Sequence, residues 1–202
     1  MASSPTAVAA TGSLLRVIAQ GVTSATLLVD NVSKTISIGQ GVVLYVAFVG
    51  AGIQNATIDN AVASLIQGKI FTFAPPPSPT GDEARPKPSA VLDAGVDVLV
   101  VPQATLGGKM KGKNVQYHAQ APKDEAAALY QRLNDQLRKQ LLPPELLSQL
   151  DVNGVVIAPP ESSDQPPAAS STRRVYCGTY GNRQALQLDS TGPMTHCFEF
   201  TN

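Results

Sequence analysis

The apolar, largely β-branched segment Val96–Val101 constrains the fold of this chain more than any other feature. The segment is closed by Pro102, and proline has no N–H to donate to a sheet. A short apolar run that ends in this way is typical of a strand buried inside a sheet. The sequence therefore predicts a central strand over Val96–Val101, with a loop beginning at Pro102.

Other segments rich in β-branched residues or alternating in polarity predict further strands. The expected strands are Leu14–Gln20, Ser24–Val29, Lys34–Ile38, Val42–Val49, Lys69–Phe73, Arg183–Leu188 and His196–Phe200. Asp30-Asn31 is the expected tip of a hairpin between the second and third of these.

Helical spacing of apolar residues predicts two substantial helices, Thr57–Gln67 and Lys123–Leu141. Thr57 is the expected N-cap of the first helix. The second has acidic residues in its first turn and basic residues in its last, as a helix dipole favours. Its expected inward face is Ala126, Leu129, Tyr130, Leu133 and Leu137. The predicted class is α/β (α+β): a mainly antiparallel, barrel-like sheet with two main helices packed outside.

Composition predicts one domain over residues 14–202. Residues 1–13 are rich in Ala, Ser and Thr without a basic cluster, so we expect a disordered tail and no secretory signal. Two Pro-rich stretches, near 75–90 and 159–172, are expected to be surface insertions because they carry too few apolar residues to bury.

The charge balance excludes a global basic field for nucleic acid, because Lys+Arg and Asp+Glu are 15 each. Any RNA contact is therefore expected to be local. The apolar stretch Gly41–Gly52 is about half of the roughly 20 residues that a membrane helix needs, so no membrane partner is expected. The two cysteines have no metal-binding spacing, which favours a reducing, cytoplasmic setting.

The familiar catalytic groups are scarce. His118 and His196 are the two histidines, without the ligand spacing of a zinc site, and neither a GxSxG elbow nor a phosphate-binding glycine loop is present. We expect no metal and no cofactor. A thiol mechanism would need Cys177 or Cys197 beside His196. Adjacent residues on a strand face opposite sides, which excludes His196 with Cys197. Buried structural thiols are the simpler interpretation, and Cys177 with His196 stays open.

Main-chain chemistry is the remaining route. A strand end followed by Gln103, Ala104 and Thr105 can present N–H groups, an amide and a hydroxyl to a carbonyl oxygen, as an oxyanion site requires. Gly192-Pro193 offers a rigid corner that bears a carbonyl. Each motif alone is more often a structural turn, so the hypothesis needs both.

Five segments in order resemble the D-aminoacyl-tRNA deacylase superfamily over nearly all of residues 14–200. They are Leu15-Arg16-Val17-Ile18, Gly41-Val42-Val43-Leu44, Val98-Leu99-Val100-Val101-Pro102-Gln103-Ala104-Thr105-Leu106, Tyr180-Gly181-Asn182-Arg183-Gln184 and Thr191-Gly192-Pro193. Standard members carry Ser-Gln-x-Thr-Leu and Asn-x-Gly-Pro at two of these places. This chain has Pro102-Gln103-Ala104-Thr105-Leu106 and Ser190-Thr191-Gly192-Pro193 there, and these departures, with the segment Leu106–His118 and Thr195-His196, are similar to the second, animal-type branch of the superfamily.

The resemblance implies hydrolysis of the ester at the 3′ end of an aminoacyl-tRNA, without metal, using main-chain groups and the 2′-OH of the RNA. It implies a homodimer whose active site combines the Pro102–Thr105 segment of one subunit with Gly192, Pro193 and Met194 of the other. Thr105 would position the aminoacyl group. The substrate, D-aminoacyl-tRNA or L-alanine mischarged on threonine tRNA, stays open. So does the isomer of the Gly192-Pro193 bond, because X–Pro isomers differ by only about 0.5–1 kcal/mol.

A local basic group accompanies these motifs. Lys109, Lys111 and Lys113 alternate with other residues before Tyr117 and His118, an arrangement suited to contacting phosphates by charge and a base by stacking. The simpler interpretation is a solvated lysine loop. Two rival functions remain: a catalytically silent binding module on the same dimeric fold, and a thiol hydrolase built on Cys177 and His196.

Overall fold

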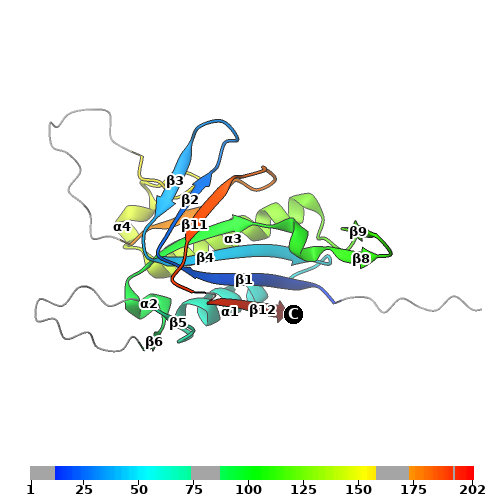
Figure 1. Cartoon of the computed structure of the whole chain (residues 1–202), viewed down its shortest axis with the longest axis horizontal. Coiled ribbons are helices and arrows are strands. Elements are labelled where there is room, and N and C mark those ends of the chain that lie inside the picture. Colours follow the sequence, from blue (N-terminus) through cyan, green and yellow to red (C-terminus); the bar gives the residue numbers. More distant parts are fainter. Residues whose placement is uncertain (1–11, 74–86, 158–172, 193) are drawn as a thin grey trace, which may run out of the picture.

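The computed structural model describes residues 12–73, 87–157, 173–192 and 194–202. It is built around a five-stranded sheet in the order β10-β7-β4-β1-β12 (Figure 1). These strands are β1 (Leu14–Val22), β4 (Gly41–Val49), β7 (Asp97–Pro102), β10 (Val175–Cys177) and β12 (Thr195–Thr201). Four of these strands are predicted by the sequence, with ends that differ by at most two residues, whereas β10 is not predicted.

The two pairings on one side of the central strand β4 are parallel. β1 pairs antiparallel with β4 and β12, whereas β4 with β7 and β7 with β10 are parallel. Parallel neighbours need a crossover connection, and here helix α1 (Asn55–Gln67) lies on the path from β4 to β7. The other strand pairings of the described residues are antiparallel, so the prediction of a mainly antiparallel arrangement is confirmed, with β4–β7 and β7–β10 as exceptions.

A second, three-stranded sheet covers one face of the first. It has the order β11-β2-β3, all antiparallel, from β2 (Ser24–Leu28), β3 (Thr35–Ile38) and β11 (Leu186–Asp189). Val43, Leu99 and Val101 point from the large sheet into the core shared with the small one. Within the described residues the strands thus form separate open sheets, and the barrel-like closure is not confirmed.

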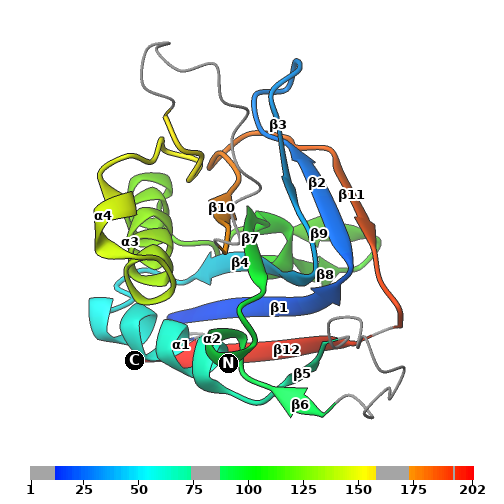
Figure 2. The ribbon, with the colours of Figure 1, turned by 90° about the vertical axis from the view of Figure 1, so that its left-hand side faces the viewer.

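Two helices cover the opposite face, as predicted (Figure 2). The helices α1 and α3 (Lys123–Leu141) pack on Val42, Leu44 and other residues of alternating position in the large sheet. The predicted inward face of α3 is buried, together with Asn134 and Leu141. The molecule therefore has three layers: helices, five-stranded sheet and three-stranded sheet.

Thr57 is not an N-cap, so that prediction was wrong. Helix α1 begins earlier, with Gln54 at the cap position and no side-chain capping bond. Thr57 is buried within the first turn, and its hydroxyl donates to Oδ1 of Asn202 at 2.9 Å. The Thr57 hydroxyl, which the sequence predicted to cap the helix, therefore makes a tertiary hydrogen bond to Asn202 instead.

The remaining elements are short. They are β5 (Phe71–Thr72), β6 (Pro88–Ser89), α2 (Val91–Ala94), the 3₁₀ turn η1 (Ala104–Gly107), β8 (Lys109–Lys111), β9 (Asn114–Gln116) and α4 (Pro144–Leu147). The end of the first expected insertion is a strand, because Pro88–Ser89 pairs with Phe71–Thr72. Residues 75–86 and 159–172 of the two Pro-rich stretches, and residues 1–11 of the expected tail, lie outside the described residues. Among the helices described, none has the length and apolarity needed to cross a bilayer.

Tyr130 ties helix α3 to the sheet. Its ring is 5% exposed, and its hydroxyl lies 3.1 Å from the carbonyl oxygen of Val100 and 2.9 Å from that of Gly178. Burial raises the pKa of this phenol well above its usual value. The hydroxyl therefore stays protonated and donates to the carbonyl groups of Val100 and Gly178.

Replacing Tyr130 with Phe should lower the free energy of unfolding by about 1–3 kcal/mol, because a buried carbonyl loses its donor. Urea unfolding followed by circular dichroism measures the change. The matched control is Tyr176→Phe on the neighbouring strand β10, where the ring is half-buried and no described group accepts from its hydroxyl. Equal destabilisation by both variants would contradict the role assigned to Tyr130.

Candidate functional site

The candidate site forms where strand β7 stops. Pro102 is the last strand residue and pairs with Val46 of β4, and the amide of Gln103 still donates to the Val46 carbonyl at 2.8 Å. The chain then leaves the sheet and closes the 3₁₀ turn η1, in which the amide of Leu106 donates to the carbonyl of Gln103. The predicted loop after Pro102 is therefore a compact turn and not a free segment.

Side chains from two other parts of the chain hold this turn. On β1, a guanidinium N–H of Arg16 donates to the Leu106 carbonyl, and the same group forms an ion pair with Glu199 of β12 at 2.6 Å. On the other side, Nε2 of Gln120 donates to the Ala104 carbonyl at 2.8 Å. Both contacts are to carbonyl groups, so neither of them occupies an amide N–H group of the turn.

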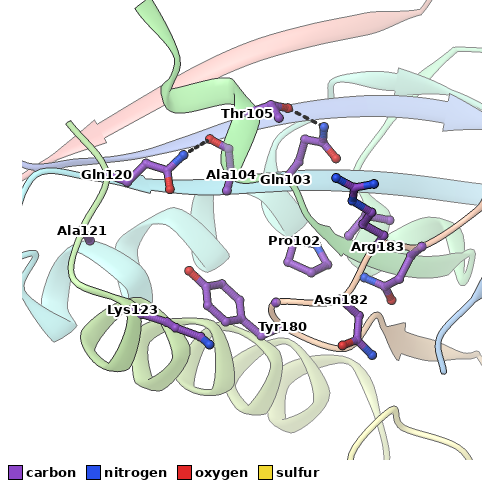
Figure 3. A pocket seen from close by; sticks show the side chains of 13 residues that line it. Pro102, Gln103, Ala104, Thr105, Gln120, Ala121, Lys123, Tyr180, Asn182 and Arg183 are labelled. Atoms are coloured by element: carbon purple, nitrogen blue, oxygen red, sulfur yellow. Dashed lines mark hydrogen bonds between the residues drawn. The ribbon is translucent and has the colours of Figure 1, made fainter. Parts of the chain in front are cut away.

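The polar groups of the turn have a defined arrangement. Nε2 of Gln103 donates to Oγ1 of Thr105 at 2.5 Å, which orients both side chains (Figure 3). The amide N–H groups of Ala104 and Thr105 have no acceptor within the described residues. Unpaired main-chain donors beside an oriented hydroxyl are what stabilises a developing oxyanion.

A cavity of about 580 Å³ opens beside this turn. Its lining residues are Val101, Pro102, Gln103, Ala104, Thr105, Gln120, Ala121, Lys123, Tyr180, Gly181, Asn182, Arg183 and Gln184. Figure 3 shows Tyr180 between Pro102 and Lys123, and Arg183 beside Gln103. The charged side chains of this set, Lys123 and Arg183, are both basic, so the cavity favours an anionic ligand.

The far wall of the cavity is a turn over residues 180–184. Gln184 stabilises it, because its Oε1 accepts from the Thr179 amide at 2.8 Å and its Nε2 donates to the Thr179 carbonyl at 3.1 Å. Gly181 has φ of +86°, a conformation that side chains rarely adopt. Its neighbour Tyr180 packs on Tyr130, with ring centroids 5.4 Å apart.

Sequence reasoning identified four of the thirteen residues that line this cavity as site residues. It predicted Pro102, Gln103, Ala104 and Thr105, and the structure brings these four together in the cavity. Gln120 and Lys123 were not predicted, because nothing in the chain marks a residue that reaches back to an earlier turn. The segment 180–184 had been noted only as part of the resemblance, although its Gly-Asn pair is a signal for a tight turn.

The predicted basic group lies outside the cavity. Lys109 and Lys111 are on β8 and Lys113 is in the turn to β9, forming an exposed hairpin (Figure 1). Tyr117 and His118 follow the hairpin and are exposed. The hairpin directly continues η1, so these residues adjoin the cavity without lining it.

The second predicted motif is far from the first in a single chain. Gly192 and Met194 line a different cavity of about 160 Å³, next to Gly21, whose amide donates to the Met194 carbonyl at 3.0 Å. Gly21 pairs with Val42 at one end of β4, whereas Pro102 pairs nearer the other end. Pro193, and with it the isomer of its peptide bond, lies outside the described residues.

The thiol mechanism is wrong for Cys177 and His196. Cys177 is on β10 and His196 on β12, the two opposite edges of the five-stranded sheet. Burial raises the pKa of Cys177, which is 3% exposed and contacts Nη2 of Arg138 at 3.1 Å. The ring of His196 instead packs against Phe71 and Phe198. Over the described ranges, no three His, Cys, Asp or Glu side chains converge as metal ligands would.

Comparison with known proteins agrees with this geometry. The profile of the D-Tyr-tRNA(Tyr) deacylase family matches residues 18–199, which is most of the chain. The chain belongs to this family. A Leishmania major protein provisionally named D-tyrosyl-tRNA(Tyr) deacylase 2 is 39% identical over 86% of this chain and 94% of its own length. The Homo sapiens protein named D-aminoacyl-tRNA deacylase 2 is 30% identical over 85% of this chain and 83% of its own.

Solved structures give the same result. One described as a probable eukaryotic D-amino acid tRNA deacylase superposes with a TM-score of 0.76 at 37% identity, covering 93% of this chain and all of the other. A second, described as a c-Myc DNA unwinding element binding protein, has a TM-score of 0.59 at 20% identity and shares the fold. The deacylase family and the mixed α/β fold expected from the sequence are thus both confirmed.

Arg16 should control the order of turn η1. In Arg16→Met, hydrogen exchange at the Leu106 and Gly108 amides is expected to become about tenfold faster, since loss of a charge-assisted hydrogen bond costs roughly 1.5 kcal/mol locally. The control is Arg132→Met, which removes an ion pair of equal length, 2.6 Å, from the helical layer. Unchanged exchange at both amides in Arg16→Met, or equal acceleration in both variants, would contradict this.

Proposed function

We propose that this protein hydrolyses the ester bond that joins an amino acid to the 3′ end of tRNA, with D-aminoacyl-tRNA as substrate. The single observation that carries the proposal is the cavity at the end of β7, where free amides of Ala104 and Thr105 lie beside the oriented Gln103 and Thr105 side chains. The relatives named as D-aminoacyl-tRNA deacylases supply the substrate class.

The proposed chemistry uses the main chain. The ester carbonyl oxygen accepts hydrogen bonds from the amides of Ala104 and Thr105, which lowers the energy of the tetrahedral intermediate. Water attacks the carbonyl carbon, the ribose oxygen leaves, and the products are a free amino acid and tRNA. Thr105 positions the aminoacyl group, and the neighbouring 2′-OH of the RNA assists proton transfer. No metal or cofactor takes part in this proposal.

The same proposal explains the surrounding charge. Lys123 and Arg183 at the cavity, with Lys109, Lys111 and Lys113 on the hairpin, provide local contacts to phosphates in a chain whose net charge is zero. Tyr117 and His118 are exposed and stand in the chain between the hairpin and Gln120 of the cavity, and they offer rings on which a base can stack. Hydrolysis of aminoacyl-tRNA also fits the cytoplasmic setting that the sequence predicts.

Hydrolysis tests the proposal. Release of the amino acid is followed with D-aminoacyl-tRNA and, separately, with L-alanyl-tRNA for threonine. We expect the wild-type protein to hydrolyse the D-aminoacyl ester rapidly. In Thr105→Val we expect kcat/KM to be about tenfold lower, because valine keeps the shape of threonine but removes the hydroxyl that accepts from the side-chain amide of Gln103. Thr26→Val, which removes a hydroxyl bonded to Ser37 on the small sheet, is the control. Hydrolysis of the L-alanyl ester alone would mean that the substrate is L-alanyl-tRNA for threonine and not D-aminoacyl-tRNA. Hydrolysis of neither ester would favour a catalytically silent binding module.

We further propose a homodimer with a shared active site. Gly192 and Met194 lie at the opposite end of the sheet from Gln103, so one chain cannot bring both motifs to one ester. A second copy of the chain can supply the Gly192-Pro193 corner to the cavity of the first, where its carbonyls would exclude one chirality of side chain.

Mixed dimers test this arrangement. Gly192→Val should fold, because a Cβ at Gly192 meets no atom within 4 Å in the chain itself. Gln103→Ala and Gly192→Val are each expected to inactivate the enzyme alone. Refolded together in equal amounts they should regain about one quarter of the wild-type activity, since half of the dimers hold one intact shared site. If the mixture stays inactive, or if the protein sediments as a monomer at assay concentration, the shared site is excluded.

A further inference from the structure

The hairpin of β8 and β9 has two faces of different chemistry. In its register Met110 lies directly opposite Val115, so these two side chains share one face. Successive side chains of a strand point to opposite faces, so Lys109 and Lys111, on either side of Met110, share the other. The hairpin is thus a thin ribbon that is apolar on one face and basic on the other.

The apolar face is open to solvent. Met110 is 70% exposed and Val115 is 47% exposed, and Tyr117, which follows β9, is 44% exposed. A Cβ built on Gly108 would meet Cγ1 of Val115 and Cε1 of Tyr117, both at 2.8 Å, so these two side chains lie together over one glycine. A two-stranded hairpin is only marginally stable in water, so side chains this exposed gain by being covered by a partner.

The basic face indicates the charge of that partner. Lys109, Lys111 and the turn residue Lys113 form no ion pair within the described residues. Residues 103–122 contain no Asp or Glu, in a chain whose net charge is zero. Local positive charge of this kind favours an anionic partner. RNA combines anionic phosphates with the flat apolar surfaces of its bases, and so it matches both faces.

The position of the hairpin also favours RNA. The hairpin follows η1 directly and projects beyond the end of the five-stranded sheet (Figure 1). The chain then returns to the sheet, where the Gly50 amide donates to the Ala119 carbonyl at 2.7 Å and Gln120 forms a bridge with Val49. Because η1 and Gln120 both line the candidate cavity, the hairpin begins and ends beside it. An RNA whose 3′ end occupies the cavity therefore passes the hairpin.

We propose that this hairpin is a wedge at the end of the acceptor helix of tRNA. Met110 and Val115 stack on the last base pair of the helix, as apolar side chains do where they part stacked bases. Lys109 and Lys111, on the opposite face, contact the phosphates of the single strand that leaves the helix and enters the cavity. The inference rests on the proposed function, which puts the aminoacyl ester in that cavity.

Substrates with and without a helix test the wedge. They are D-aminoacyl-tRNA and the D-aminoacyl ester of the trinucleotide CCA. The double variant Met110→Ser, Val115→Ser should lower kcat/KM about tenfold on the tRNA, which is the size expected for one lost base-stacking contact, and leave the trinucleotide rate unchanged. The double variant Lys109→Gln, Lys111→Gln should slow both substrates and weaken the salt dependence of both, because the single strand is present in each.

The control variant is Val32→Ser, which alters an 81% exposed side chain between β2 and β3 and should change neither rate. An equal loss on both substrates in Met110→Ser, Val115→Ser would overturn the inference, as would an unchanged rate on the tRNA. If the wild-type protein hydrolyses neither ester, the proposed function is refuted, and the following binding experiment decides the wedge by itself.

Fluorescence detects the wedge without hydrolysis. 2-Aminopurine, an adenine analogue that brightens when it loses its stacking neighbours, replaces the unpaired nucleotide before CCA in uncharged tRNA. The wild-type protein at saturation should raise its fluorescence, and Met110→Ser, Val115→Ser should not. No rise with the wild-type protein, or an equal rise with the variant, would overturn the inference. Binding to anionic phospholipid vesicles that depends on Met110 and Val115 and is unaffected by tRNA would also overturn it, since the apolar face would then be a lipid contact.

Discussion

The candidate site depends on the parallel pairing of β7 between β4 and β10. This pairing buries β7 on both sides, so the strand leaves the sheet only where Pro102 cannot donate to the ladder. The amide of Gln103 still bonds to Val46, and the next residues must turn. Arg16 and Gln120 bond to carbonyl groups of that turn, and the amides of Ala104 and Thr105, two residues that line the cavity, have no acceptor within the described residues. Strand order and proline chemistry together create a main-chain site.

Helix α3 and its Tyr130 extend this organisation to the wall of the cavity. Tyr130 hydrogen-bonds to the carbonyl groups of Val100 and Gly178 and supports the ring of Tyr180, which lines the cavity. Lys123, the first residue of the helix, lines the same cavity.

The antiparallel pairing of β1 with β12 keeps the Gly192 motif away from the Gln103 turn within one chain. It carries the chain before Thr195 back to Gln20 and Gly21, at the end of the sheet away from Gln103. The two motifs that resemble the deacylase family are therefore separated within a chain by the register of the same sheet. The homodimer proposed above reconciles this register with a single substrate, because a second copy supplies the Gly192 corner, around which a Cβ would meet no atom of its own chain within 4 Å.

The sequence alone determined the local features: most of the strands, helix α3 with its inward face, the end of strand β7 at Pro102, and the family through its motifs. These follow from periodicity and proline chemistry, which depend on near neighbours in the chain. Tertiary structure alone decided that β4, β7 and β10 are parallel, that Thr57 bonds to Asn202, and that Gln120, Lys123 and residues 180–184 complete the first cavity. It also separated Cys177 from His196 and left Oδ1 of Asn134 without a hydrogen-bond partner within the described residues. The reason is physical: strand order and hydrogen bonds between distant residues depend on how the layers pack, and no local pattern encodes which far residue arrives at a given edge.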